Sequence, residues 1–353
     1  MKKFFIFLIP ALLLSAGCDV FSKGGSAGLS KTINGGVDWI LANKQDGGSG
    51  SMQAANISKL EIDPNNRENI YAGSYNGGLF LSTDSGGTWK NILSNSTVFD
   101  FAVNMANPKI IYAAGDIGGL GRVVKTSDGG KSWLKAYNES TPNNPVRSIA
   151  LNPSNPEHLV IGTDSGTVIK STDGGLNWQL LKNFSNKINR IYWTNSGVYV
   201  LVREKGLFKG SGVGDDFTDL TSGLRSEGLL NQFSKTGSVK IFNQAYVDPL
   251  SSNLLYVTTD IGLFKSIDLG KNWTAVKLPV KQEALNARPI VVAKQNSNTV
   301  LTAIGSIVYK STDGGNSFQT QNVPFLNAFV NYLVMDPVLP QIMYVGGYVN
   351  QNN

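Results

Sequence analysis

The sequence predicts an all-β fold, a seven-bladed β-propeller of four-stranded blades in which both chain ends complete the last blade. An eight-residue pattern with a hydroxyl residue, Asp, Gly and a closing aromatic residue occurs seven times along the 353 residues. The copies start 39 to 56 residues apart, at positions 32, 82, 126, 171, 210, 266 and 311. A period in the forties is typical of one propeller blade. Short apolar runs between turn residues separate the copies, and no run has the pattern of a long amphipathic helix.

The repeated pattern predicts a tight turn between two strands. Its clearest copies are Ser82–Trp89 and Ser171–Trp178, whereas Asn34 and Gly212 replace Asp in two diverged copies. Asp and Ser side chains can bond nearby backbone amides, Gly can supply a positive φ, and the aromatic ring can fill the space between neighbouring sheets. We therefore assign a structural role to the residues at the Asp position and at the closing aromatic position of the pattern. The first set is Asn34, Asp84, Asp128, Asp173, Asp268 and Asp313, and the second is Trp39, Trp89, Trp133, Trp178 and Trp273.

This pattern resembles the Asp box, the bacterial neuraminidase repeat, from about residue 29 to residue 349. The resemblance extends to photosystem-assembly-factor-like, sortilin-like and xyloglucanase-type propellers. It implies that the boxes lie away from the functional face.

The two ends of the chain are predicted to form one blade together. Upstream of a box, runs such as Leu60–Ile62, Ile70–Gly73 and Gly78–Leu81 read as strands A, B and C, and strand D follows the box. Residues 332–346 supply strands A and B and no box, whereas the box at 32–39 has no A or B before it. Joining them closes the ring and removes exposed sheet edges.

The N-terminus predicts export and a lipid anchor. A basic start and the apolar run Phe4–Leu14 precede three small residues and Cys18, which is the order of a secretory signal. Cys18 is the single cysteine, and its position resembles the bacterial lipobox, although Ser15 stands where Leu is usual. We expect a signal peptide over 1–17, a lipid-anchored flexible tether over 18–28 and the propeller over 29–353. The protein would face the periplasm or the cell exterior. Ordinary signal cleavage is the alternative.

Composition argues against several function classes. The net charge of +6 is not concentrated in runs of Lys and Arg, so we expect no nucleic-acid partner. With one His and one Cys, the chain offers no His-rich or Cys-rich metal site, and we expect no metal and no cofactor. We expect a monomer.

The rim opposite the boxes is the predicted binding face. Residues that begin the innermost strands should ring the mouth of the central channel, and we align Ser58, Phe99, Arg147, Asn243, Arg288 and Asn331 there, with Arg190 near the same level. The turns between strands B and C add Asp116, Asp164, Glu204 and Asp260 to this rim. Such a rim could bind an anionic ligand or a peptide, or could be solvated surface charge. An insertion over 222–238 is either a functional loop or a surface excursion.

Two function classes remain open. Sialidases share the boxes, but they use six blades, an early Arg-Ile-Pro segment and a Tyr-Glu pair; here the related segment, Arg288-Pro289-Ile290, has another order and place. Xyloglucanase-type enzymes enclose their carboxylates between two propellers, whereas this chain encodes one. We therefore expect no catalytic residues and a membrane-tethered propeller that binds an envelope protein or a glycan. The alternative is a sialidase- or xyloglucanase-like glycoside hydrolase acting on envelope or environmental glycans.

Overall fold

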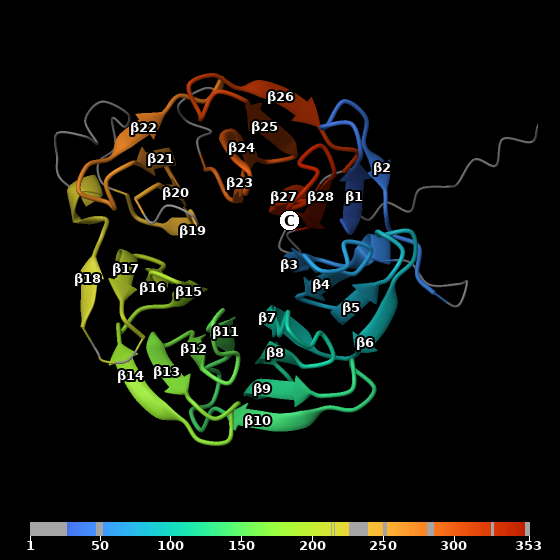
Figure 1. Ribbon diagram of the computed structural model, residues 1–353, viewed down its shortest axis with the longest axis vertical. Helices are drawn as coiled ribbons and strands as arrows, with labels where there is room; N and C mark the ends of the chain where they lie inside the picture. The colour runs from blue at the N-terminus through green and yellow to red at the C-terminus, as the bar shows by residue number, and fades with distance from the viewer. Residues whose placement is uncertain are drawn as a thin grey trace, which may run out of the picture.

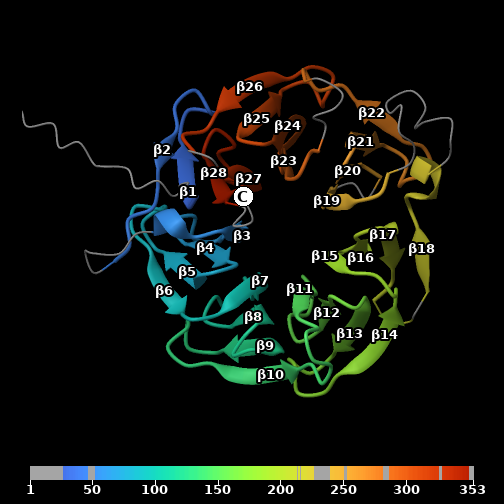
Figure 2. The ribbon, with the colours of Figure 1, turned by 180° about the vertical axis from the view of Figure 1, so that it is seen from behind.

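Seven four-stranded antiparallel sheets are arranged as blades around a common axis (Figure 1). This computed structural model describes residues 27–46, 52–212, 214, 216–225, 239–249, 253–280, 286–325 and 328–349. The view from behind shows the same closed ring, with one strand of each blade innermost and one outermost (Figure 2). The predicted fold class is confirmed.

The blades follow one another in chain order. Blade 1 contains β3 (Ile57–Ile62), β4 (Ile70–Ser74), β5 (Gly78–Ser82) and β6 (Lys90–Leu93). Blade 2 contains β7 (Thr97–Val103), β8 (Ile111–Asp116), β9 (Gly121–Thr126) and β10 (Leu134–Asn138). Blade 3 contains β11 (Val146–Leu151), β12 (Leu159–Thr163), β13 (Thr167–Ser171) and β14 (Gln179–Asn183). Blade 4 contains β15 (Ile188–Thr194), β16 (Gly197–Val202), β17 (Gly206–Gly210) and β18 (Phe217–Asp219).

The remaining blades complete the ring. Blade 5 contains β19 (Phe242–Val247), β20 (Leu255–Thr259), β21 (Gly262–Ser266) and β22 (Thr274–Val276). Blade 6 contains β23 (Ile290–Ala293), β24 (Asn296–Ile304), β25 (Ile307–Ser311) and β26 (Gln319–Asn322). Blade 7 contains β27 (Phe329–Met335), β28 (Met343–Tyr348), β1 (Leu29–Thr32) and β2 (Ile40–Leu41). Two short 3₁₀ helices, η1 (Met52–Ala54) and η2 (Ser222–Arg225), lie between strands.

Blade 7 is built from both ends of the chain, as predicted. Its strand order is β2-β1-β28-β27, and β1 pairs with β28 from Leu29↔Gly346 to Thr32↔Met343. Blade 7 is also held to blade 1 by the ion pair of Arg67 Nη1 with Asp336 Oδ2 at 3.1 Å. The first and last strands of the chain therefore pair with each other and leave no gap in the ring.

The repeated eight-residue copies form the turns between the third and fourth strands. In the first full copy, the Ser82 hydroxyl donates to Asp84 Oδ1 (2.7 Å) and accepts from the Gly86 amide (2.8 Å), while the Thr88 amide donates to Asp84 Oδ1 (2.8 Å). The same three bonds recur in the copies that start at 32, 126, 171, 266 and 311. Asn34 therefore replaces Asp without loss of a bond.

The closing tryptophans connect neighbouring blades. Trp89 is fully buried, and its Nε1 donates to the carbonyl oxygen of Ala42 at the outer edge of blade 7 (2.8 Å). Trp133, Trp178 and Trp273 likewise donate to the preceding blade, at Ile92, Ala136 and Leu220. Nε1 of Trp39 is buried without a partner among the described residues. Each large indole side chain thus fills the space between two sheets, where its apolar burial stabilises the propeller.

Several sequence-based expectations fall outside this description. The signal peptide, Cys18 and most of the tether lie before residue 27, and residues 226–238 of the insertion lie outside the described part of the chain. Within the described ranges, no helix is long and apolar enough to cross a membrane.

Candidate functional site

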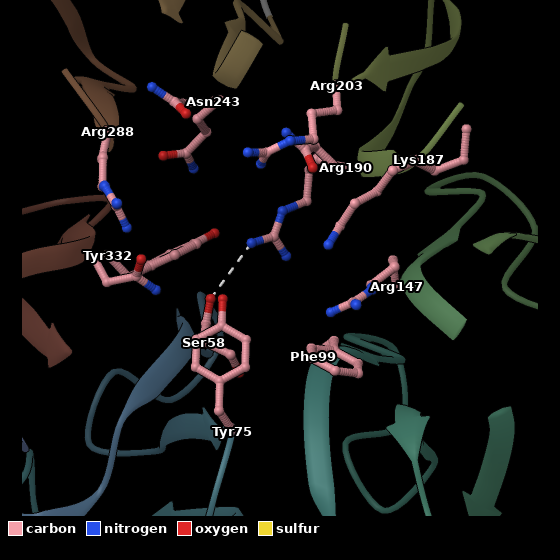
Figure 3. Close-up of a pocket in the computed structure, with 14 residues that line it drawn as sticks. Ser58, Tyr75, Phe99, Arg147, Lys187, Arg190, Arg203, Asn243, Arg288 and Tyr332 are labelled. Atoms are coloured by element: carbon pink, nitrogen blue, oxygen red, sulfur yellow. Dashed lines mark hydrogen bonds between the residues drawn. The ribbon is translucent and has the colours of Figure 1, made fainter. Parts of the chain in front are cut away.

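One mouth of the central channel holds a cavity of about 200 Å³ that residues from all seven blades line (Figure 3). Its cationic residues, called here the cationic mouth, are Arg147, Lys187, Arg190, Arg203 and Arg288. No Asp or Glu is among the described residues that line this cavity. The remaining lining is aromatic or uncharged: Ser58, Tyr75, Phe99, Ile188, Asn189, Asn243, Gln244, Asn331 and Tyr332.

A repeated β-bulge places these side chains. In six blades the pairing of the innermost strand shifts by one residue near its start, for example between Ile57 and Lys59 in β3. A bulge leaves one residue unpaired and re-aims its side chain. The residues so released are Ser58, Phe99, Arg147, Asn189, Asn243 and Asn331.

The bulge explains why the aligned rim residues lie at the same level and why Arg190 lies one residue away from that level. Arg147, Asn243 and Asn331 occupy the bulge position, and Arg288 lies just before β23. In blade 4 the bulge residue is Asn189, so Arg190 lies one residue further into the channel.

Two asparagines of the predicted rim connect adjacent blades. Asn243 Nδ2 donates to the carbonyl oxygen of Ala287 (2.7 Å), and Asn331 Nδ2 donates to that of Ile57 (2.7 Å). Ser58 and Asn189 make the equivalent bonds from their own bulges. These bonds connect neighbouring blades, so the four side chains shape the mouth.

Arg147 is held in place by an acid and an aromatic ring. Its Nε lies 2.6 Å from Asp164 Oδ1, and its guanidinium carbon lies 4.0 Å from the centre of the Phe99 ring, a cation–π distance. Lys187 Nζ lies 3.1 Å from the same Asp164 oxygen. Burial raises the pKa of Asp164, but the charges of Arg147 and Lys187 outweigh this and lower it below its ordinary value. One carboxylate therefore balances two cations.

Arg190 lies deeper, over a buried carboxylate. Its Nη1 lies 3.0 Å from Asp100 Oδ1 as an ion pair whose N–H is not aligned for a hydrogen bond. Asp100 is fully buried and also contacts Lys59 Nζ at 3.1 Å, the Ser148 hydroxyl at 2.6 Å and the Ile149 amide at 3.1 Å. Burial alone would raise the pKa of Asp100, but these cations and hydrogen bonds together lower it. Arg190 is thus fixed at the floor of the mouth.

Arg203 and Arg288 carry the free charge of the mouth. Arg288 is exposed, with its guanidinium carbon 5.9 Å from the centre of the Phe329 ring. Arg203 is half-buried and lies in the turn after β16. Neither guanidinium has an ion-pair partner among the described residues.

The acids of the predicted rim do not line the cavity. Asp116 is exposed at the end of β8, and Glu204 is exposed and accepts a bond from Asn186 Nδ2 (3.0 Å). Asp260 Oδ1 accepts from the amides of Lys240 and Ile241, at 3.2 Å each. Asp164 is the rim acid that contacts lining residues, and it serves to hold two cations. Within the described residues, no cluster of three or more His, Cys, Asp or Glu could hold a metal ion.

Sequence reasoning missed part of this site. Lys187 and Arg203 reach the mouth from turns, and Asp100 and Lys59 lie one residue beyond their bulges. No pattern in the sequence marks these positions, because the bulge lets two consecutive residues, such as Asn243 and Gln244, line the same cavity.

Comparison with known proteins supports the architecture. Residues 77–210 match the Sortilin-Vps10 family, described as sortilin, neurotensin receptor 3. A search of curated proteins found no match.

Solved structures with the same fold come from several protein classes. A YCF48 structure bound to a D1 peptide is 17% identical, with 85% of this chain and 93% of that chain covered and a TM-score of 0.60. YCF48 from Cyanidioschyzon merolae is 14% identical, with 93% and 100% covered and a TM-score of 0.58. The GH74 xyloglucanase from Xanthomonas campestris is 15% identical, with a TM-score of 0.64; the alignment covers 83% of this chain and 51% of the enzyme. At these identities the likeness establishes the fold alone.

Proposed function

We propose that this chain is a membrane-tethered, extracytoplasmic binding propeller whose cationic mouth recognises an acidic segment of a protein partner. The observation that carries the proposal is a cavity lined by five cationic side chains and no described carboxylate. A concave site with charge of one sign concentrates ligands of the opposite sign.

The positive charge of the mouth is only partly compensated. Arg147 and Lys187 share Asp164, and Arg190 shares Asp100 with Lys59. The two outer cations, Arg203 and Arg288, face the cavity without an ion-pair partner among the described residues. An acidic ligand would therefore gain contacts that the folded protein does not supply internally, and its association would weaken with added salt.

The aromatic side chains favour a polypeptide ligand. Tyr75 and Phe99 have ring centres 5.6 Å apart, and Phe99 carries the Arg147 guanidinium on its face. Arginine and aromatic residues dominate protein-binding hot spots. The structurally similar YCF48 has been captured with a peptide, which supports a peptide ligand for this chain as well.

Glycoside hydrolysis, the alternative class, receives less support from this mouth. Such enzymes place a carboxylic acid and a carboxylate on either side of the bond to be cleaved. The described lining contains neither, and the lowered pKa of Asp164 opposes a role as proton donor at neutral pH. The similarity to a xyloglucanase covers half of that enzyme.

A crosslinking capture in cells tests the proposal. The variant Arg203→Glu with Arg288→Glu reverses the two outer charges and leaves the buried ion pairs intact. The matched control, Lys109→Glu with Lys131→Glu, makes the same change in net charge at exposed lysines of blade 2. We expect the mouth variant to lose a partner with an acidic segment, and the control to retain it.

The same partner segment, made as a peptide, then provides a direct measurement. Its affinity should fall at least tenfold in the mouth variant and should decrease with ionic strength. Equal capture and equal affinity for both variants would refute the proposed function.

A further inference from the structure

The opposite end of the channel holds a second, larger cavity of about 590 Å³. This volume lies within the range of about 300–1,000 Å³ that is usual for ligand pockets. Its opening is formed by the turns between the first two strands of the blades. We call it the proline-rimmed cavity because its edge includes Pro64, Pro153, Pro156, Pro249 and Pro337.

The proline-rimmed cavity has a closed floor. Gln244 and Tyr332 line both cavities and therefore separate them. Beside them, Lys59 and Arg190 meet on the buried Asp100 carboxylate, at 3.1 and 3.0 Å. A ligand must consequently enter and leave through one opening, which suits a small molecule or the end of a chain and excludes an extended strand that threads the channel.

The wall of this cavity is mostly apolar and aromatic. On the innermost strands, the residues two positions after those at the floor line the wall. They include Tyr192 and Tyr246 and the small side chains of Ala102 and Ala150. The rings offer flat apolar faces, and the alanines leave room beside them. This composition contrasts with the cationic mouth.

The charges of the proline-rimmed cavity nearly cancel. Glu61 lies 3.2 Å from Lys59, which also donates to the Phe101 carbonyl oxygen at 2.6 Å. Lys294 is exposed and lies at the edge. Inside this edge an uncharged ligand is the best match, because Lys59 is already paired with Glu61 and Asp100 and a charged ligand would meet no surplus of the opposite sign there.

Several hydrogen-bonding groups line this cavity. Among the described residues, the hydroxyls of Tyr246 and Tyr332 have no hydrogen-bond partner, and the Glu61 carboxylate forms one ion pair, with Lys59. The Tyr192 hydroxyl accepts from the Ala245 amide (3.0 Å) and keeps its own proton to donate. Because an ionised carboxylate only accepts, the ligand must bring donors as well as acceptors.

We propose that the proline-rimmed cavity is a second binding site, and that it takes a neutral saccharide. Sugar rings combine hydroxyl groups that donate and accept with apolar faces that pack on aromatic rings. Those are the two features that this wall and floor present together. This inference is independent of the function proposed for the cationic mouth.

The test uses an array of neutral oligosaccharides as the probe, followed by calorimetric titration of the strongest binder. Glu61→Gln removes the charged acceptor and leaves Lys59 paired with Asp100. We expect it to weaken binding at least tenfold, and Tyr246→Phe to weaken it several-fold. The mouth variant, Arg203→Glu with Arg288→Glu, is the control that should bind normally. Melting curves verify that each variant folds.

Three results would overturn the inference. The first is an array on which no neutral saccharide binds the wild type. The second is a binder that Glu61→Gln does not affect. The third is a neutral peptide from a display library that binds in this cavity while no saccharide does. None of these results bears on capture of an acidic partner at the other mouth, so the two proposals fail separately.

Discussion

Nη1 of Arg190 in blade 4 lies 3.0 Å from the carboxylate of Asp100 in blade 2. Through its other contacts, Asp100 also joins Lys59 of blade 1 and Ser148 of blade 3. One buried side chain thus connects four consecutive blades. Its charge is the reason that Arg190 can be buried beneath a mouth that is already cationic.

We expect Asp100→Asn to destabilise the fold by about 3 kcal/mol, because removing one partner of a buried ion pair leaves the other charge uncompensated. Here two cations, Lys59 and Arg190, would lose their shared carboxylate. Urea denaturation measures the loss. Asp116→Asn, at an exposed position of the same blade, is the control and should change stability by less than about 0.5 kcal/mol. Equal midpoints for the two variants would contradict the role assigned to Asp100.

Stability should depend on pH in the acid range. The pKa values of Asp100 and Asp164 are lowered in the folded protein, chiefly by adjacent cations that outweigh the effect of burial. The folded state therefore favours the ionised carboxylates. The stabilisation is complete above the ordinary Asp pKa of about 3.9 and is lost as the pH falls through the lower folded values.

Melting temperatures between pH 7 and pH 2 check this expectation. The contribution of these two carboxylates to the melting temperature should stay constant from pH 7 down to about pH 4. Below about pH 4 the melting temperature should decrease. Asp100→Asn should make the acid decline shallower. The turn aspartates act in the same direction; hydrogen bonds from Asn177 and Ser171 lower the pKa of Asp173 to about 2. A variant whose decline matches the wild type would show that Asp100 does not contribute.

The first two tryptophans of the Asp boxes, Trp39 and Trp89, can be compared. Trp89→Phe removes the N–H that bonds Ala42 at 2.8 Å and leaves that carbonyl without this donor. We expect a loss of about 1–2 kcal/mol. Trp39→Phe loses similar ring volume but removes a buried N–H that has no partner among the described residues, so it should cost less than Trp89→Phe. Equal losses in denaturant titrations would refute the role of the inter-blade bond.

The repeat made the fold predictable, because each copy reports the same turn and the same neighbouring strands. The copy at 32–39 and the strands at 332–346 also predicted closure, since each lacks what the other supplies. The Asp-box bonds depend on residues within one turn of chain, and local chemistry of this kind can be read from sequence.

The site was predictable only in part. Alignment located Arg147 and Arg288 and placed Arg190 near the same level. A bulge has no signature in the letters of Ile188–Arg190, so the position of Arg190 one residue beyond the bulge could not be predicted. The contacts of Asp100 join residues 41 and 90 positions away, at Lys59 and Arg190. Such pairs depend on the ring geometry that brings separate blades together, which no single segment encodes.

The predicted lipid anchor can be tested by replacing one residue, Cys18. If Cys18 carries a lipid, Cys18→Ala should shift the protein from the membrane fraction to the soluble fraction, and should abolish incorporation of a labelled fatty acid. A single chain of this type binds membranes only weakly, whereas two or more chains anchor stably. Retention of both properties by Cys18→Ala would exclude lipidation at this residue.

Ring closure predicts a sharp boundary for truncation from the N-terminus. A chain that starts at Ala27 keeps β1 and β2, and also the Ala27 amide bond to the Gln53 carbonyl oxygen (3.0 Å). We expect it to melt cooperatively, near the temperature of the full chain. A chain that starts at Asn43 lacks both strands, so it exposes the edge of β28 and the apolar faces that blade 7 shares with its neighbours. It should lose the cooperative transition and aggregate, because a propeller that lacks half a blade is no longer closed. Circular dichroism melts and size-exclusion chromatography of the two chains measure the difference, and a cooperative, monomeric shorter chain would show that β1 and β2 do not close the ring.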